Sequence, residues 1–250
     1  MLYNFSELQK YVVKATNDEI GKVEDLYFED TTWGIHYLVA DTGNWLAENL
    51  VLLTPTKISE INEKERQVLF ELSKKKIEDS PPVYQDKPVY RQKELEILDY
   101  YKDWPHYWAA FSQAPPPTMP VILARRKNKD SQKSSQDYED QNNAHLRSCQ
   151  EVTNYNLHAT DGKFGHVEDF LVNDQNWKIE FFVVDTKNWL PFSKKVLISP
   201  KWINKIIWAS EEVKVNLAQD LIKNSPEYDH TKPILQEYID VLYEYYNLHE

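Results

Sequence analysis

Two pairs of adjacent carboxylates are the first residues whose type could support catalysis. Glu24-Asp25 and Glu168-Asp169 each follow a valine, in the stretches "VEDL" and "VEDF". Paired carboxylates act as general acid and base when both face one substrate. Here both pairs fall in segments with strand character, where neighbouring side chains point to opposite faces. We therefore expect no acid–base cooperation within a pair, and expect one carboxylate to face solvent or accept a local hydrogen bond.

Metal and nucleophile chemistry have little support in this sequence. The 7 histidines form no HxxxH or His–Cys group at metal spacing. His158 and His166 flank a predicted hairpin, but no third ligand can be identified. The single cysteine, Cys149, lies in no motif, and a buried inert thiol is expected. With 5 glycines and no nucleotide-binding pattern or nucleophile elbow, the chain is expected to be non-enzymatic and to hold no cofactor or metal.

A six-residue stretch, "DTGNWL" at 41–46, returns as "DTKNWL" at 185–190. Asp41 and Asp185 each follow an apolar run, where a carboxylate accepts a backbone N–H two residues on and fixes a turn. Trp45 and Trp189 are expected to fold across the mouth of each domain as structural lids, because large aromatics mostly serve in packing. The alternative is a small-molecule or metal-binding sensor with a site between the domains, bordered by these two tryptophans.

These motifs recur because the chain repeats itself over a long distance. Residues 7–46 and 151–190 are identical at 17 of 40 positions without a gap. After one inserted residue near 192–195 the match resumes, and "EDSPPVYQDKP" answers "KNSPEYDHTKP". Such a period is too long for a solenoid repeat and suits a whole domain. We predict a tandem duplication.

Three segments follow from the repeat: a first domain with a C-terminal helix at 1–104, a linker at 105–147 and a second such domain at 148–250. The linker holds "QAPPPTMP" and then a polar stretch without apolar periodicity, so it is expected to be partly disordered. Its "ARRKNK" contains Arg125, Arg126 and Lys127. This basic cluster is either a docking segment for an acidic partner or anionic surface, or a solvated linker, which we favour.

Within each copy the strand signals are short and frequent. "NDEIGKVEDLYFED" and "TDGKFGHVEDFLVND" combine turn residues with broken apolar alternation, and "WGIHYLVADT" and "WKIEFFVVDT" are apolar enough for central strands. Further strands are expected at "NLVLLTP", "QVLFEL" and their counterparts, and short helices at "SKKKIEDSP" and "AQDLIKNSP". No long amphipathic helix separates the strands, which disfavours a parallel α/β sheet. The prediction is a mainly β (β+α) chain with two small antiparallel β-barrels, each followed by short helices.

The pattern "IGKVEDLYFED…WGIHYLVADTGNWL…VLLTP" resembles the PRC-barrel family, and "FGHVEDFLVND…WKIEFFVVDTKNWL…VLISP" fits the same pattern. The similarity covers roughly residues 4–90 and 148–235, and the runs ending in "KP" resemble the segment after the barrel in soluble bacterial members. The resemblance implies a six-stranded, mostly antiparallel barrel used for interaction, with no shared catalytic site.

Charge narrows the range of partners. The chain has 40 acidic and 29 basic residues, a net charge of -11, which opposes binding to nucleic acid. Apolar runs such as "FFVV" fall far short of the ~20 residues that a membrane span requires. No secretory signal is visible at the N-terminus, and a single cysteine cannot form an internal disulfide, so a cytoplasmic location is expected.

Together these observations favour a scaffold protein with an unknown protein partner. The two domains are expected to pack about a pseudo-twofold axis as an intramolecular pseudo-dimer, with a homo-oligomer left open. The closing helices supply the candidate contact residues, which are Tyr100, Tyr101, Tyr245 and Tyr246. Their aromatic side chains suit an interface.

Overall fold

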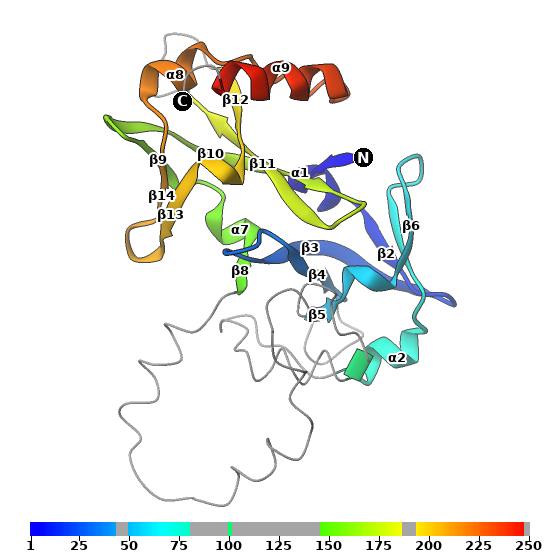
Figure 1. The fold of residues 1–250 in the computed structure, drawn as a ribbon. Coiled ribbons are helices and arrows are strands. Elements are labelled where there is room, and N and C mark those ends of the chain that lie inside the picture. Colours follow the sequence, from blue (N-terminus) through cyan, green and yellow to red (C-terminus); the bar gives the residue numbers. More distant parts are fainter. Residues whose placement is uncertain (44–49, 81–99, 102–145, 187–193, 248–250) are drawn as a thin grey trace, which may run out of the picture.

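The computed structural model describes residues 1–43, 50–80, 100–101, 146–186 and 194–247. The chain is mainly β, with two seven-stranded sheets and few helices (Figure 1). We call residues 1–101 the first half and residues 146–247 the second half. No helix in the described ranges is long and apolar enough to cross a membrane.

The first sheet has the strand order β5-β4-β3-β2-β7-β6, and β8 from the second half pairs with β3. Its long strand β3 and the apolar β4 form the centre, as the apolar patterns predict. The elements of this half are β1 (Leu2–Asn4), α1 (Phe5–Leu8), β2 (Val12–Lys14), β3 (Glu19–Glu29), β4 (Ile35–Asp41), β5 (Leu50–Leu53), the 3-10 turn η1 (Pro55–Lys57), β6 (Ile58–Asn62), β7 (Gln67–Phe70) and α2 (Lys74–Glu78).

The second sheet has the order β12-β11-β10-β9-β14-β13, and β1 from the first half pairs with β10. Strand for strand, this is the order of the first sheet. The short helix α8 confirms the helix predicted at "AQDLIKNSP", as α2 does for "SKKKIEDSP". The elements are β8 (Leu146–Ser148), α7 (Cys149–Val152), β9 (Asn156–Ala159), β10 (Gly162–Asn173), β11 (Lys178–Asp185), β12 (Lys195–Ile198), η3 (Pro200–Trp202), β13 (Ile203–Ile207), η4 (Trp208–Ser210), β14 (Glu212–Val215), α8 (Gln219–Asn224) and α9 (Gln236–Asn247).

The prediction of two antiparallel barrels is wrong in two respects. Each sheet contains one parallel pair, β2 with β7 and β9 with β14. Neither sheet closes, because within the described residues no ladder joins the end strands β5 and β6, or β12 and β13. A 3-10 turn that begins at Pro55 or Pro200 separates these consecutive strands. Proline has no N–H to donate to a ladder, so the chain leaves one strand and enters the next without pairing them.

Two glycines at equivalent positions allow one strand to cross closely over another. A Cβ built on Gly21 would lie 1.8 Å from the carbonyl oxygen of Asp41, and one on Gly165 would lie 2.3 Å from that of Asp185. Gly165 also has a φ of +66°, in the left-handed region that favours glycine. The register of β10 against β9 shifts at this point, which agrees with the predicted bulge or tight bend.

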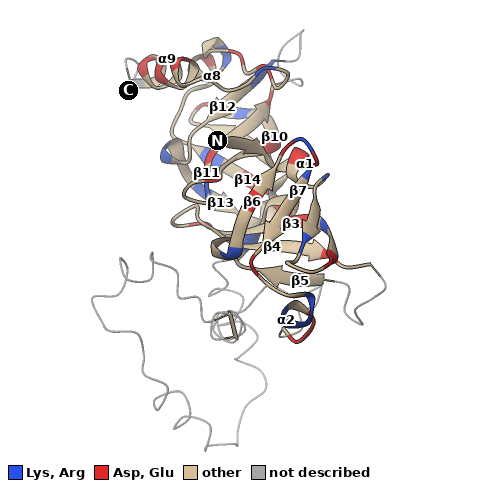
Figure 2. Ribbon diagram, turned by 90° about the vertical axis from the view of Figure 1, so that its right-hand side faces the viewer, with Lys and Arg blue, Asp and Glu red and all other residues tan. Residues whose placement is uncertain are grey.

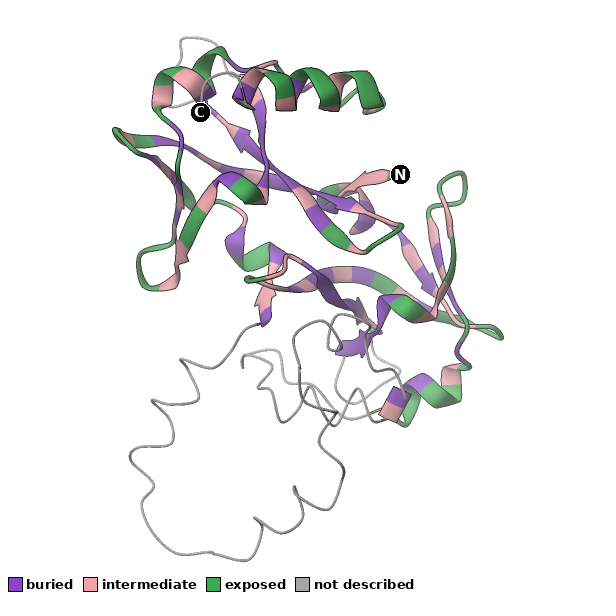
Figure 3. Ribbon diagram, viewed as in Figure 1, coloured by how far each residue is buried: buried purple, intermediate pink, exposed green. Residues whose placement is uncertain are grey.

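Burial is concentrated on the central strands. Six consecutive residues of β4 are buried, so its apolar run is covered on both faces. Figure 3 shows the same concentration along β3, β4, β10 and β11, while the outer edges and helices are more exposed. Acidic and basic residues are interspersed over the outside of both halves (Figure 2). Both faces of the central strands are therefore covered by other parts of the chain.

Candidate functional site

Two short arms cross between the halves and define the candidate site. β1 adds an antiparallel strand to β10, with Asn4 opposite Leu171. β8 adds an antiparallel strand to β3, with Ser148 opposite Tyr27. In Figure 1 the N-terminal arm lies against the second half, and β8 and α7 lie against the first. Each half therefore completes the sheet of the other.

A buried carboxylate holds the arm of the second half. Asp25 is 5% exposed and accepts hydrogen bonds from the hydroxyl of Ser148 and, at 3.0 Å, from the backbone N–H of Gln150. It also accepts the N–H of Leu26 at 2.7 Å. Gln150 stands in the first turn of α7, where backbone N–H groups have no intrahelical acceptor. Asp25 thus caps a helix that belongs to the other half.

The equivalent carboxylate, Asp169, holds the arm of the first half in the same way. It is 8% exposed and accepts the Ser6 hydroxyl at 2.5 Å and the Ser6 backbone N–H at 3.1 Å. The N–H of Phe170 donates to it at 2.8 Å. Ser6 lies in the first turn of α1, whose own N-cap residue, Asn4, makes no side-chain cap hydrogen bond. The second carboxylate of "VED" in each copy is therefore an assembly residue.

Burial sets the ionisation of these two groups. Desolvation raises the pKa of Asp25 to about 6, and the hydrogen bonds from Ser148 and Gln150 offset part of that rise. Desolvation also raises the pKa of Asp169, again partly offset by Ser6. Cys149, at the start of α7, is a free and fully buried thiol, as expected, and burial raises its pKa well above the ordinary value. The thiol therefore stays protonated and inert.

The tips of the two central hairpins contact each other as well. The N–H of Ile35 donates to the carbonyl of Trp177 at 2.6 Å, and the N–H of Ile179 donates to the carbonyl of Trp33 at 2.9 Å. Gly34 and Lys178 form an isolated bridge between them. Both tryptophans have positive φ, 61° and 50°, which is rare for a bulky residue. The exchanged hydrogen bonds hold this conformation in place.

An aromatic cluster fills the space beneath the arms. Phe170 contacts Phe5 of the first arm at 6.4 Å between ring centroids, Phe28 of β3 at 6.2 Å and Phe182 of β11 at 4.8 Å. Trp33 stacks on Phe28 at 5.9 Å and meets the edge of Phe182 at 5.5 Å. Phe28, Phe170 and Phe182 are fully buried. The core thus runs continuously from one half into the other.

Charged groups at the rim repeat the reciprocal pattern. Arg147 of β8 pairs with Asp30 of the first half, with Nε and Oδ2 separated by 3.3 Å, and its guanidinium lies 3.8 Å from the ring centroid of Trp208. On the opposite side the N-terminal amine of Met1 pairs with Asp174, the counterpart of Asp30. Such partly exposed pairs add little stability singly, but they fix the register of each arm.

The four predicted tyrosines lie in other places. Tyr100 donates its hydroxyl to the carbonyl of Lys76 at 2.7 Å, and Tyr245 donates to that of Leu221 at 2.9 Å. Tyr101 is 5% exposed and Tyr246 is fully buried, with its ring 4.2 Å from that of Trp202 in the second half. These contacts hold the four tyrosines against their own halves, and among the described residues the junction between the halves is made by others. A role of these tyrosines toward an external partner stays a prediction.

Of the remaining predictions, the turn at Asp41 is confirmed, and the other residues lie outside the part of the chain that the structure describes. Asp41 accepts the N–H of Gly43 at 2.8 Å, two residues on, as predicted. Trp45 and Trp189, proposed as lids or as the border of a sensor site, lie outside the described residues, as do Arg125, Arg126 and Lys127 of the linker.

The sequence carried a signal for the junction that residue-by-residue reasoning did not use. Asp25, Asp30 and Trp33 are each identical in the second copy, as Asp169, Asp174 and Trp177. Polar and aromatic residues shared by two halves whose other polar residues mostly differ indicate a common structural role. That role is the contact between the halves. The sequence pattern within one half cannot reveal it, because the contacting residues lie in different halves.

We expect the halves to stay together after the chain is cut between them. A protease site introduced at residues 125–127 of the full chain would allow cleavage of the folded protein. The two pieces should then elute as one species on size exclusion, because both arms and the aromatic cluster bind across the cut. The same cleavage of an Asp25→Ala/Asp169→Ala variant is the matched comparison, and it should release more free fragment. Separation of the unmodified pieces would contradict this expectation.

Comparison with protein-family models finds a match in the first half. The family model described as the PRC-barrel domain matches residues 6–77, which covers β2 to β7 and α2 of the first half and leaves the second half unmatched. No curated protein matches the chain.

Proposed function

We propose that this chain, whose residues 6–77 belong to the PRC-barrel domain family, is a non-enzymatic interaction protein. In this proposal two PRC-barrel-like halves arose by tandem duplication and pack about a pseudo-twofold axis. The match supports the first half, and the equal strand order supports the second. Duplication of a unit that pairs with its own copy yields a self-complementary contact within one chain.

The observation that carries the proposal is the reciprocal use of the shared polar residues. Asp25 and Asp169 are buried and spend their hydrogen-bonding capacity on Ser148, Gln150 and Ser6 of the opposite arms. A catalytic carboxylate needs access to a substrate, whereas these two are closed off by the arms. Asp25 and Asp169 therefore serve assembly, which leaves the outer surface of each half for partners.

We also propose a cytoplasmic location, with which a chain that has a single cysteine and no second one to form an internal disulfide is compatible. A scaffold in that compartment has protein partners, and the acidic balance of 40 acidic to 29 basic residues favours partners with a basic face.

Cross-linking and affinity purification from native cells test the proposal. The tagged full chain is expected to enrich a protein many-fold over the tag alone, and an Asp25→Ala/Asp169→Ala variant should enrich it less, since the relative placement of the halves is loosened. A wild-type chain that enriches nothing over the tag would contradict the scaffold proposal.

A further inference from the structure

Four basic residues lie directly opposite one another across four neighbouring strands of the second sheet. Lys205 of β13 stands opposite Lys214 of β14, and Lys214 stands opposite His158 of β9. His158 in turn stands opposite Lys163 of β10. We call these four residues the basic row. Since neighbouring strands are about 4.8 Å apart, the row spans about 14 Å.

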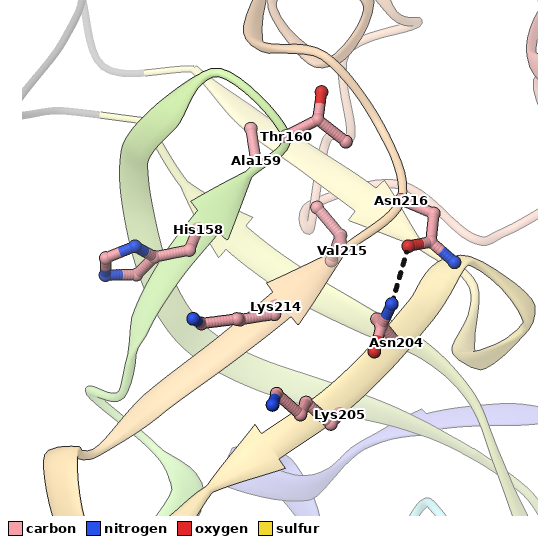
Figure 4. Close-up of a pocket in the computed structure, with 8 residues that line it drawn as sticks. All are labelled: His158, Ala159, Thr160, Asn204, Lys205, Lys214, Val215 and Asn216. Carbon is pink, nitrogen blue, oxygen red and sulfur yellow. Dashed lines mark hydrogen bonds between the residues drawn. The ribbon is translucent and has the colours of Figure 1, made fainter.

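The basic row faces outward from the sheet. Its strand neighbours Leu157, Val213 and Phe164 are at most 1% exposed and point into the core. Because successive side chains of a strand alternate between faces, the members of the row point the other way. Figure 4 shows His158, Lys214 and Lys205 extending side by side on that face. Three adjacent strands thus present basic side chains to the same space.

Three members of the row, His158, Lys205 and Lys214, border a hollow of about 390 Å³, which is within the range of small-molecule sites. Thr160, Asn204 and Asn216 line its other side. The amide of Asn204 donates to Asn216 at 3.0 Å, which fixes these two side chains across the strands (Figure 4). The hollow therefore combines cationic groups with neutral hydrogen-bonding groups.

The positive charge of the row is poorly balanced by neighbouring acids. Glu212 lies 3.1 Å from Nε2 of His158. Among the residues that the structure describes, no acid lies within ion-pair distance of Lys163, Lys205 or Lys214. Like charges directly opposite each other destabilise a sheet. A protein with a net charge of -11 has thus gathered cations at one place on this sheet.

The first half lacks such a row, although its strands pair in the same way. The corresponding positions hold Glu60 opposite Leu69, Leu69 opposite Lys14, and Lys14 opposite Glu19. Two acids and one base there leave no excess of positive charge. A sheet with this strand order therefore forms without a basic row. The row points to a role other than folding, such as binding a ligand.

We propose that the basic row and its hollow bind a small ligand that carries a chain of phosphate groups. Lysine ammonium groups bind phosphate as point charges, and a chain of several phosphates can meet several lysines of a linear row at once. A single carboxylate or sulfate would leave most of the row unmatched. Inorganic polyphosphate and a nucleoside triphosphate share this chemistry. The binding site lies on the outer face of the second half, away from the junction.

Calorimetric titration of the full chain with inorganic tripolyphosphate tests the proposal. We expect binding of one ligand per chain that weakens as salt is added. In a Lys163→Gln/Lys205→Gln/Lys214→Gln variant, affinity should fall at least about tenfold, because each lost lysine removes one ammonium–phosphate contact. The single variant Lys214→Gln, at the centre of the row, should weaken binding about threefold and serves if the triple variant does not fold.

Two matched variants test whether binding depends on the lysines of the basic row or on positive charge anywhere in the chain. Lys22→Gln/Lys64→Gln removes two exposed lysines of the first half and should leave affinity unchanged. Neutralising Arg125, Arg126 and Lys127 of the linker should also leave it unchanged. Unchanged affinity in both row variants would overturn the proposal, as would loss of binding with the linker variant alone.

Other ligands distinguish the sources of the phosphate chain. Equal affinity for tripolyphosphate and ATP assigns the site to the phosphate chain of either source, and tighter binding of ATP assigns it to a nucleotide. Citrate, which carries three carboxylates, should bind much more weakly. If citrate binds as tightly as tripolyphosphate through the same row, the phosphate assignment is overturned.

Discussion

Replacing Phe170 with alanine is expected to lower the free energy of unfolding by about 3–5 kcal/mol, the usual cost of removing a buried phenylalanine. Phe170 is fully buried and contacts Phe5, Phe28 and Phe182, so its ring joins the first arm, the first sheet and the second sheet. Denaturant unfolding followed by tryptophan fluorescence measures the change. Because the ring bridges both halves, we also expect the transition to broaden or to split into two.

A double-mutant cycle distinguishes energetic coupling between the two halves through Phe170 from the simple loss of a buried side chain. Phe28→Ala and Phe170→Ala should be non-additive by about 0.5–1.5 kcal/mol, because their rings are in contact. Phe70 is a matched control: it is 1% exposed but lies on β7, two strands away from β3. Phe70→Ala and Phe170→Ala should add. Full additivity of Phe28 and Phe170 would show that the aromatic cluster does not couple the halves.

Asp25 should give the protein a distinctive pH dependence. Its pKa is about 6 in the folded chain, against about 3.9 for an unperturbed aspartate. The folded state therefore prefers the protonated carboxyl. This contribution to stability is fully present below about pH 4 and is lost as the pH rises through about 6. We expect the wild type to lose about 2–3 kcal/mol relative to Asp25→Asn between pH 4 and pH 7, because the amide does not ionise.

A further variant at Asp25 and a comparison with Asp18 strengthen the pH measurement. Asp25→Ala removes the acceptor for Ser148, Gln150 and Leu26, and it should destabilise the protein by about 2–4 kcal/mol at pH 4. The cost should be smaller at pH 7, because alanine does not ionise and the wild type has lost the contribution of its protonated carboxyl there. Asp18 is a control whose contribution to stability should change with pH in the opposite direction, because its hydrogen bond to Lys74 lowers its pKa. The contribution of Asp18 is present at neutral pH and is lost as the pH falls. A wild type whose stability relative to Asp25→Asn does not change with pH would contradict the buried-carboxylate account.

Much of the sheet could be predicted from the sequence, because its strands are long and apolar. Six residues of β4 and residues 181–184 of β11 are continuous buried runs, and β3 and β10 begin after turn residues, so the local pattern suffices. The arms β1 and β8 could not be predicted. Each has 3 residues, too few to show a period of two, and each pairs with a strand far away in the sequence.

The candidate sites could not be predicted for the same reason, because they depend on the register between strands that are distant in the sequence. Lys163, Lys205 and Lys214 form no local motif, and only the pairing of β10, β9, β14 and β13 brings them together. The roles of Asp25 and Asp169 likewise follow from the partner strand and not from their own neighbours. Closed barrels were expected from the short, frequent strands and from the family resemblance, and the proline turns at Pro55 and Pro200 account for the open edge.

The exchanged arms impose an order on folding during synthesis. β1 is made first, yet its partner β10 leaves the ribosome roughly 160 residues later. At 5–20 residues per second this is a wait of roughly 8–32 s. For most of that interval β3 also lacks β8, and the apolar ring of Phe28 has no cover from Phe170. The nascent first half is therefore an unfinished sheet, and a neighbouring nascent chain that offers the same edge competes with the rest of its own polypeptide.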